Sequence, residues 1–267
     1  MIEVIDRVPT YPGRVKLTPV SGQANIFDME RADEPVEPGT PINRALFQSF
    51  IDEMNTIRQQ VEDKLLEISQ RVRVGDLADG TVFGLYENGV LVPFIKLKND
   101  YPDSGRYLVV RKDCVTADVL MNAGEKYYAD GRIDLWLNNE YLSTLDAATQ
   151  SSIPNAGVQA DSAYGVAAAY RKVFLLSLYE YQMTTSDIAV MGNHISYFST
   201  TDKRIATLDG TPVNHWTRSS NYPRYIAAYI TPTGEHEIGD VYTTIAGIRP
   251  AFTLPANFEV SVLAPGT

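Results

Sequence analysis

The clearest hydrophobic pattern in the chain is a long stripe of apolar residues in its first third. Its members from Phe50 to Val72 are separated by four, three, four, four, three and four residues, the spacing of a coiled-coil seam with one stutter. Thr40 is a favourable N-cap, and Pro41 suits the first helical position, where its missing N–H group is not needed. The sequence therefore predicts one helix over residues 40–73. The stripe consists of Leu46, Phe47, Phe50, Met54, Ile57, Val61, Leu65, Ile68 and Val72.

An apolar stripe of this length requires a packing partner, because the opposite face of the helix is polar. Two partners are open: the chain's own domain, or other copies of the same helix in a parallel bundle. We favour self-association as a homotrimer. The polar face carries Asp52, Glu53, Arg58, Gln59, Glu62, Asp63 and Lys64. The expected oligomerisation residues are Phe50, Met54, Ile57, Val61, Leu65, Ile68 and Val72.

The first 39 residues differ in composition from the rest of the chain. They are rich in proline, glycine and acidic residues, so they bury little apolar area by themselves. Residues 14–20 alternate polar and apolar side chains, which predicts a short strand. A disordered tail seldom carries such a strand. We interpret residues 1–39 as an arm that becomes ordered against a partner, and a disordered tail is the alternative.

From residue 74 onward the pattern changes to short strands and turns with a few helical segments. Apolar runs at 81–86 and 90–97 flank Asn88-Gly89, both of which accept positive φ, so a β-hairpin is predicted. Further expected elements are strands at 107–111, 172–177 and 247–254, a helix at 133–142 and a helical turn at 146–148. The predicted fold class is α+β. The predicted parts are an extended arm (1–39), an amphipathic coiled-coil helix (40–73) and a domain of short mixed or antiparallel strands with a few helices (74–267).

Charge and cysteine content narrow the possible functions. The net charge is −10 and the sequence pI is about 4.8, and Lys and Arg form no basic patch, so we expect no nucleic-acid partner. Cys114 is the single cysteine, so an intramolecular disulfide is excluded, and a buried or inert thiol is expected. The N-terminal sequence lacks the basic and apolar regions of a signal peptide, and no apolar run reaches the roughly 18 residues that span a membrane. We expect a protein made in the cytoplasm without a signal peptide and without membrane insertion.

Catalytic motifs are missing from the sequence. It contains no Gly-x-Ser-x-Gly elbow, no phosphate-binding loop and no His-Glu-x-x-His pair. Glu235-His236-Glu237 could ligate a metal, but the glycines on either side favour a solvated hairpin tip. A carboxylate pair such as Glu235 and Asp240 is expected by chance among 33 acidic residues, so it carries no weight. We expect no enzyme, no catalytic residue, no metal site and no cofactor.

The strongest candidate for a contact surface is the segment that begins at Trp216. It is rich in Tyr, Ser and Asn, the composition of antibody-like paratopes, and aromatic faces also stack on sugars. Asn193, His194 and Tyr197 precede it in a predicted loop and could join it. The alternative is that Trp216 and Arg218 support the core. The predicted ligand-binding residues are Trp216, Arg218, Asn221, Tyr222, Arg224, Tyr225, Tyr229 and Tyr242.

Two parts of the chain resemble known families. The first is Gly39-Thr40-Pro41-Ile42-Asn43, preceded by Tyr11-Pro12-Gly13-Arg14-Val15. It resembles the N-terminal anchors of phage tail fibre and baseplate-associated proteins over about 45 residues. This resemblance implies attachment to other tail or baseplate proteins through residues 1–45, followed by trimerisation.

The second part, residues 74–262, resembles a C-type-lectin-like domain of the kind seen at the ends of phage tail proteins and in bacterial surface proteins. It is similar in fold to the variable proteins of diversity-generating retroelements and to formylglycine-generating enzymes. The resemblance covers about 70% of the chain and implies a fold rather than a ligand. The calcium-binding Glu-Pro-Asn and Trp-Asn-Asp motifs and the paired cysteines of the enzymes are absent. The blocks that carry it are Val92-Pro93-Phe94-Ile95, Leu137-Asn138-Asn139-Glu140-Tyr141, Val173-Phe174-Leu175-Leu176-Ser177-Leu178-Tyr179-Glu180, Trp216-Thr217-Arg218-Ser219 and Gly247-Ile248-Arg249-Pro250-Ala251-Phe252.

The residues and the two resemblances predict a phage virion protein of the tail or baseplate. Its C-terminal domain is expected to bind a host cell-surface receptor, either a glycan or a protein. Three alternatives remain: a structural baseplate or capsid decoration protein without a host ligand, an enzyme that degrades cell-wall or capsule glycans, and a bacterial adhesin or component of a contractile injection system.

Overall fold

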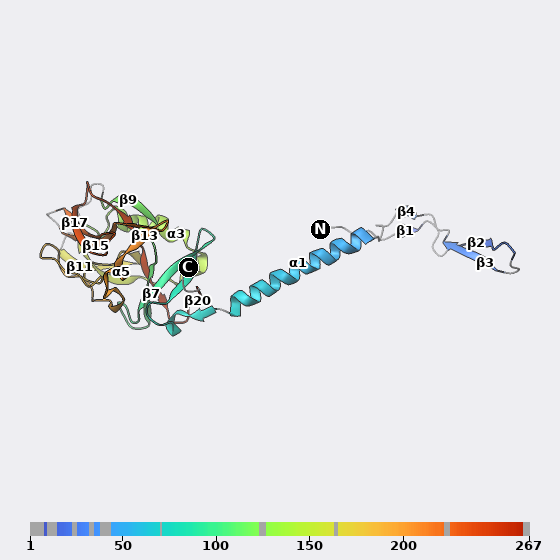
Figure 1. Cartoon of the computed structure of the whole chain (residues 1–267), viewed down its shortest axis with the longest axis horizontal. Coiled ribbons are helices and arrows are strands. Elements are labelled where there is room, and N and C mark those ends of the chain that lie inside the picture. Colours follow the sequence, from blue (N-terminus) through green and yellow to red (C-terminus); the bar gives the residue numbers. More distant parts are fainter. Residues whose placement is uncertain are drawn as a thin grey trace. The chain divides into compact units, whose positions relative to one another are not determined.

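The computed structural model divides the chain into two units, Met1–Leu66 and Glu67–Thr267 (Figure 1). The described residues are mostly strand with a few helices, which confirms the α+β class. None of the described helices is long and apolar enough to cross a membrane. The structure describes residues 8–9, 15–22, 26–31, 35–37, 44–69, 71–122, 127–162, 165–221 and 225–263.

Two small strand pairs precede the long helix in the N-terminal unit. β1 (Val8–Pro9) pairs with β4 (Pro35–Glu37), and β2 (Val15–Pro19) pairs with β3 (Phe27–Arg31). The strand predicted at residues 14–20 is therefore confirmed as β2. In the β2–β3 register Leu17 lies opposite Met29, and both side chains are exposed, at 57% and 71%. Pro19 lies opposite exposed Phe27 two positions away, so these four residues share one face of the hairpin.

The predicted long helix is α1 (Arg44–Ser69). Residues 40–43, where we expected the N-cap, lie outside the described residues. The prediction that the helix continues to residue 73 is wrong at its C-terminal end, because Val72 lies in strand β5 (Arg71–Arg73). Val72 pairs with Val260 and packs against the core of the C-terminal unit, so it is not part of a helical seam. The alternation Arg-Val-Arg suits an edge strand, and pairing with a neighbouring strand prevails there over the helical period.

Two mixed or antiparallel sheets build the described part of the C-terminal unit, as predicted. The seven-stranded sheet has the order β12-β19-β8-β7-β6-β20-β5, and the five-stranded sheet has the order β17-β16-β15-β18-β9. The seven strands are β12 (Val173–Phe174), β19 (Ala251–Pro255), β8 (Arg106–Arg111), β7 (Val90–Lys98), β6 (Val82–Glu87), β20 (Glu259–Val262) and β5. The five are β17 (His236–Asp240), β16 (Ile226–Ile230), β15 (His215–Asn221), β18 (Ile245–Ile248) and β9 (Thr116–Leu120). Two further hairpins are β10 (Ala156–Ser162) with β11 (Gly165–Arg171), and β13 (Ala206–Leu208) with β14 (Thr211–Val213).

Short helices connect these strands. The predicted helix at 133–142 is confirmed as the continuous run of α2, η2 and α3, and the predicted turn after Asp146 is confirmed as α4. Asn88 and Gly89 have φ values of 49° and 79°, so the turn between β6 and β7 is of the expected kind. The helical segments are η1 (Val74–Asp76), α2 (Arg132–Trp136), η2 (Leu137–Tyr141), α3 (Leu142–Thr144), α4 (Ala147–Ser152), η3 (Ser196–Phe198) and α5 (Thr201–Arg204).

Two predicted strands are shorter than expected. The segment 247–254 is not one strand, because it divides at Arg249-Pro250 into β18 of the five-stranded sheet and β19 of the seven-stranded sheet. Proline has no N–H group for strand pairing, so the chain leaves one sheet there and enters the other. The predicted strand 172–177 contains only β12, although Leu175 and Leu176 beyond it are buried.

The central strands of the seven-stranded sheet are buried on both faces, which explains the continuous apolar runs in β7 and β8. Phe94 and Val109 face one hydrophobic cluster, and Ile95 and Val110 face another. The first cluster also contains Trp216 of the five-stranded sheet. The core therefore forms from side chains far apart in sequence, packed around one central sheet.

Candidate binding sites

Trp216 was predicted to contact a ligand, but the structure buries it. Only 1% of its surface is exposed, and its indole Nε1 donates a hydrogen bond of 2.7 Å to the carbonyl oxygen of Val119. Its ring meets that of Tyr229 edge to face, at 5.6 Å between centroids. Trp216 therefore joins β15 to β9 and to the core, and the prediction of a surface contact is corrected.

Arg218 is also fully buried, and it forms the centre of a polar network. Its Nη1 and Nη2 atoms lie 2.6 and 2.7 Å from the two carboxylate oxygens of Glu180, in a bidentate pair. The guanidinium also donates to the carbonyl oxygens of Gln159 and Leu175, each at 2.7 Å. Tyr101 donates its hydroxyl to the same Glu180 carboxylate at 2.5 Å.

Charge in this network is balanced inside the protein. Burial, the largest single influence, would lower the pKa of Arg218, but the charge and hydrogen bond of Glu180 together with Tyr101 and Tyr128 raise it overall. Burial raises the pKa of Tyr101, and the Glu180 charge raises it further, so its hydroxyl stays protonated and donates. The network joins β15 to the loop after β12, and Arg218 is a structural residue rather than a ligand contact.

Tyr229 is likewise part of the structure. It is 8% exposed, and its hydroxyl donates a hydrogen bond of 2.5 Å to Glu237 on the neighbouring strand β17. Burial and this bond raise the pKa of Tyr229 to about 12. The side chain therefore links two strands, and the ring is covered by Trp216.

Three of the predicted contact residues lie together at one end of the five-stranded sheet. Tyr225 and Tyr242 are partly buried, and their rings lie 5.7 Å apart at an angle of 42°. Asn221 ends β15 and pairs with the first residue of β16, directly after Tyr225. We call Asn221, Tyr225 and Tyr242 the tyrosine patch. Two other predicted residues, Tyr222 and Arg224, lie outside the described residues.

The backbone holds the two tyrosines in place. Tyr225 has a φ of 55°, and its carbonyl oxygen accepts a hydrogen bond of 2.9 Å from the Val241 N–H. The Asp240 carboxylate accepts a bond of 2.8 Å from the Tyr242 N–H. These bonds align the turn after β17 with the start of β16, so both rings lie at the same sheet end, where they also pack against the first hydrophobic cluster.

The other residues considered in the sequence analysis lie elsewhere in the C-terminal unit. The His194 ring is tilted by 45° against that of Tyr179, at 4.1 Å between centroids, and Tyr197 packs against the second hydrophobic cluster. Glu235 closes the tight turn between β16 and β17, where its carbonyl oxygen accepts a bond from the Thr231 N–H. Cys114 is buried, and desolvation raises the pKa of its thiol to about 11. Across the residues the structure describes, no group of three His, Cys, Asp or Glu side chains is arranged to hold a metal ion.

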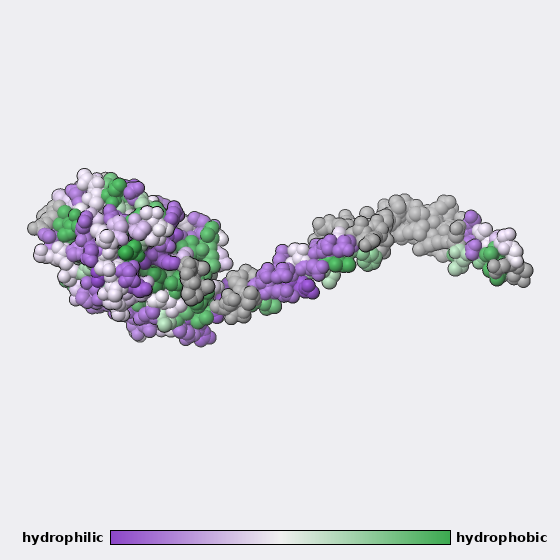
Figure 2. Space-filling view, in the orientation of Figure 1, coloured by the Kyte–Doolittle hydropathy of each residue, from purple (hydrophilic) through white to green (hydrophobic). Residues whose placement is uncertain are grey.

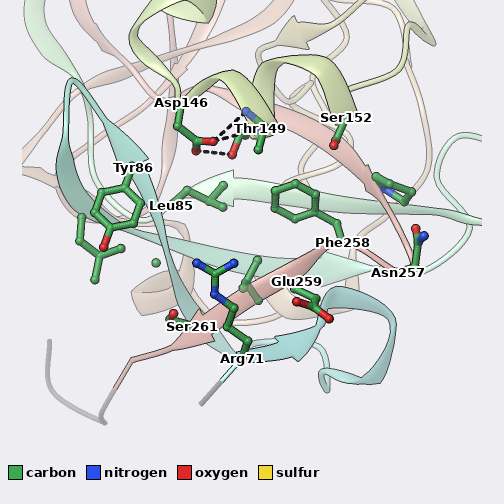
Figure 3. A pocket seen from close by; sticks show the side chains of 15 residues that line it. Arg71, Leu85, Tyr86, Asp146, Thr149, Ser152, Asn257, Phe258, Glu259 and Ser261 are labelled. Carbon is green, nitrogen blue, oxygen red and sulfur yellow. Dashed lines mark hydrogen bonds between the residues drawn. The ribbon is translucent and has the colours of Figure 1, made fainter. Parts of the chain in front are cut away.

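A groove of about 440 Å³ lies between β6 and β20, and the sequence analysis did not find it (Figure 3). The two strands pair at Gly84–Ser261 and Phe83–Val262, and the Leu263 N–H donates to the Val82 carbonyl oxygen just beyond. Leu85 and Tyr86 on one strand, and Glu259 and Val260 on the other, line the groove beyond that pairing. We call this cavity the β6–β20 groove. No sequence motif indicates it, because its walls come from segments around residues 71, 84–91, 146–152 and 255–261.

Helix α4 closes one side of the groove. Its N-cap Asp146 accepts hydrogen bonds of 3.0 Å from the N–H groups of Ala148 and Thr149, and one of 2.6 Å from the Thr149 hydroxyl. The dashed lines in Figure 3 mark these bonds above the groove. Both carboxylate oxygens of Asp146 are thus engaged in capping. The groove lining also includes an arginine, a glutamate, an asparagine and hydroxyls, together with the rings of Tyr86 and Phe258.

Residues 104–256 match the model of a domain family of unknown function, DUF6273. The match covers more than half of the chain, so the chain belongs to this family. No curated protein and no solved structure matches it. The matched region contains the tyrosine patch and the Arg218 network apart from Tyr101, whereas the groove walls on β5, β6 and β20 lie outside it.

Proposed function

We propose that this chain is a phage virion protein of the tail or baseplate that binds a host cell-surface receptor. In this proposal α1 forms a homotrimeric coiled coil, and residues 1–45 attach to other tail or baseplate proteins. The C-terminal unit is a lectin-like domain that contacts a glycan or a protein on the host. Binding at several copies of a site raises the overall affinity above that of one site.

The observation that carries the proposal is the exposed apolar stripe of α1. Met54 is 70% exposed and Leu65 is 60% exposed, although each would gain stability by burial. Figure 2 shows apolar side chains placed between strongly polar ones along the visible face of this helix. Full burial of one such side chain contributes about 1.5–3 kcal/mol, so a self-complementary stripe strongly favours association of several copies of the helix. The side chain of Ile68 lies outside the described residues. The exposed members are Phe47, Phe50, Met54, Ile57, Val61 and Leu65.

The β2–β3 hairpin supports the docking role of the arm. Its face with Leu17, Phe27 and Met29 is exposed, and a two-stranded hairpin is marginally stable without a surface to pack on. A partner that covers this face would order the arm. A tail or baseplate protein is the partner that the resemblance of the N-terminal segment favours.

The tyrosine patch supports the receptor-binding role of the C-terminal unit. Two adjacent rings with polar ends, held by backbone hydrogen bonds, give a rigid contact area at low entropic cost. The lectin-like assignment of the unit rests on the five sequence blocks described above. These blocks lie on β7, on the helical segment η2, on β12 and the segment after it, on β15, and on β18–β19.

The oligomer is tested by light scattering on the full-length protein. We expect a trimer for the wild type, and a monomer when Ile57→Asp introduces a charge into the stripe. The matched control is Arg58→Asp, which changes charge on the polar face and should leave the trimer intact. A monomeric wild type would contradict the proposed coiled coil.

Receptor binding is tested with labelled full-length protein on cells of the host bacterium. We expect the Tyr225→Ala/Tyr242→Ala double variant to bind at least tenfold more weakly than the wild type. The control is Tyr170→Ala, which removes an exposed ring from β11. A trimer that binds no cells would instead favour a structural baseplate or capsid decoration protein.

A further inference from the structure

We propose that the β6–β20 groove is a second ligand site in the C-terminal unit, and that it takes a short neutral saccharide. The inference deepens the proposed function by naming a ligand class, and its biological setting rests on that function. The saccharide binding itself depends only on the groove. Its walls, its polar groups and its charge each point to this class of ligand.

The size of the groove suits a small molecule. Its volume of about 440 Å³ lies within the range of roughly 300–1,000 Å³ that is usual for ligand pockets. Gly84 makes room for Leu91 on the β6 side, because a Cβ atom at Gly84 would lie 2.6 Å from Leu91 Cδ1. Leu91 itself lines the groove, so a larger residue at position 84 would change the shape of this wall.

Aromatic rings supply apolar faces for a sugar ring. Tyr86 is 38% exposed, and Phe258 is partly buried against the first hydrophobic cluster. Figure 3 shows the two rings on either side of Leu85. Aromatic side chains offer a flat apolar face, which fits the C–H face of a pyranose, and Tyr adds a polar end.

Polar side chains surround these rings. Ser261 is the register partner of both Arg71 and Gly84, so Arg71 and Ser261 point to the same face of the sheet. In Figure 3 the Arg71 guanidinium extends into the middle of the groove, with Asn257 and Ser152 at its far end. Arginine, asparagine and hydroxyl groups supply the donors and acceptors that vicinal hydroxyls of a sugar require. Asp146 does not take part, because α4 engages its carboxylate.

Charge favours a neutral ligand over an acidic one. The groove lining carries one cation, Arg71, and two carboxylates, Glu259 and the capping Asp146, so its formal charge is negative. The whole chain has a net charge of −10, which opposes the approach of a strongly anionic glycan. A neutral saccharide binds through its hydroxyls, so neither the charges of the groove nor the net charge of the chain repels it.

The experiment is saturation-transfer NMR on the full-length protein with glucose, galactose, N-acetylglucosamine and maltose, and with glucuronic acid as the acidic probe. We expect transfer to at least one neutral sugar. Tyr86→Ala should weaken that binding at least tenfold because it removes the stacking face, whereas Tyr86→Phe should retain it. Asn257→Ala, which changes an exposed side chain, should weaken binding severalfold without affecting the fold. Tyr170→Ala is the control outside the groove.

Loss of binding in Tyr86→Ala and Asn257→Ala, with binding kept in Tyr86→Phe and Tyr170→Ala, supports the proposal. If Tyr86→Ala unfolds, Asn257→Ala decides. Transfer to none of the neutral sugars, a preference for glucuronic acid, or binding that both groove variants retain overturns it. Saccharide binding without binding to cells would reject only the proposed function. Cell binding without saccharide binding would reject only this inference.

Discussion

Replacing Arg218 by alanine should destabilise the C-terminal unit strongly. The guanidinium is fully buried and forms a bidentate pair with Glu180, which is also fully buried. Without Arg218 the Glu180 carboxylate stays in the core without its counter-charge, and removing one partner of a buried pair costs about 3–5 kcal/mol. With a urea dependence of about 2 kcal/mol per molar, the unfolding midpoint should fall by roughly 2 M.

Urea unfolding followed by tryptophan fluorescence measures this change. Both tryptophans of the chain, Trp136 and Trp216, lie in the C-terminal unit, so the signal reports on that unit. Arg132→Ala is the control, since Arg132 is exposed and should change the free energy of unfolding by less than about 0.5 kcal/mol. The double variant Arg218→Met/Glu180→Met removes both charges and should recover most of the loss. A loss below about 1 kcal/mol in Arg218→Ala would refute the reasoning that Arg218 is a structural residue.

Two further predictions concern His215, which is buried, and Val72, which is partly buried against the core. His215 is buried and has a pKa well below its usual 6.5, because desolvation and the Arg249 charge disfavour the cation. The neutral His215 side chain therefore contributes its full stabilisation above pH 6.5. As the pH falls below 6.5 toward the lower folded pKa, the free energy of unfolding decreases by up to about 1.4 kcal/mol per pH unit. Urea unfolding at pH 7.5 and 5.5 should show a smaller drop for His215→Phe than for the wild type, and equal drops would contradict this cause. Val72→Ala should lower the stability of the C-terminal unit by about 1 kcal/mol without changing the oligomeric state seen by light scattering, since Val72 packs in β5. If this variant dissociated the oligomer, the result would contradict the assignment of Val72 to β5 and would support its place in the helical seam.

Local patterns in the sequence predicted part of the secondary structure, and they did not predict strands such as β9, β10, β11, β13 and β14. The hairpin at Asn88-Gly89, the helix α1 and the helical run at 132–144 depend on turn residues and apolar periods that act within a few residues. Errors arose where tertiary contacts decide. Val72 fits a helical seam equally well by spacing, and only its pairing with Val260 assigns it to a strand.

The candidate site was predicted only in part for the same reason. Composition singled out the segment from Trp216 as a contact surface, and the tyrosine patch lies within that selection. Composition does not show which of its aromatic and cationic residues face the core. Trp216 and Arg218 are buried because Val119, Glu180 and Gln159, all distant in sequence, meet them there.

What the sequence alone determined is the arrangement of elements along the chain: an arm with a short strand, a helix with one apolar stripe, and a region of short strands and turns. These features follow from side-chain periodicity and turn chemistry, which are local. The tertiary structure alone decided which polar groups are buried in pairs, where the chain passes from one sheet to the other at Pro250, and that β6 and β20 separate to leave a groove. These depend on burial and on pairing between distant segments, and both exist only once the whole unit has packed.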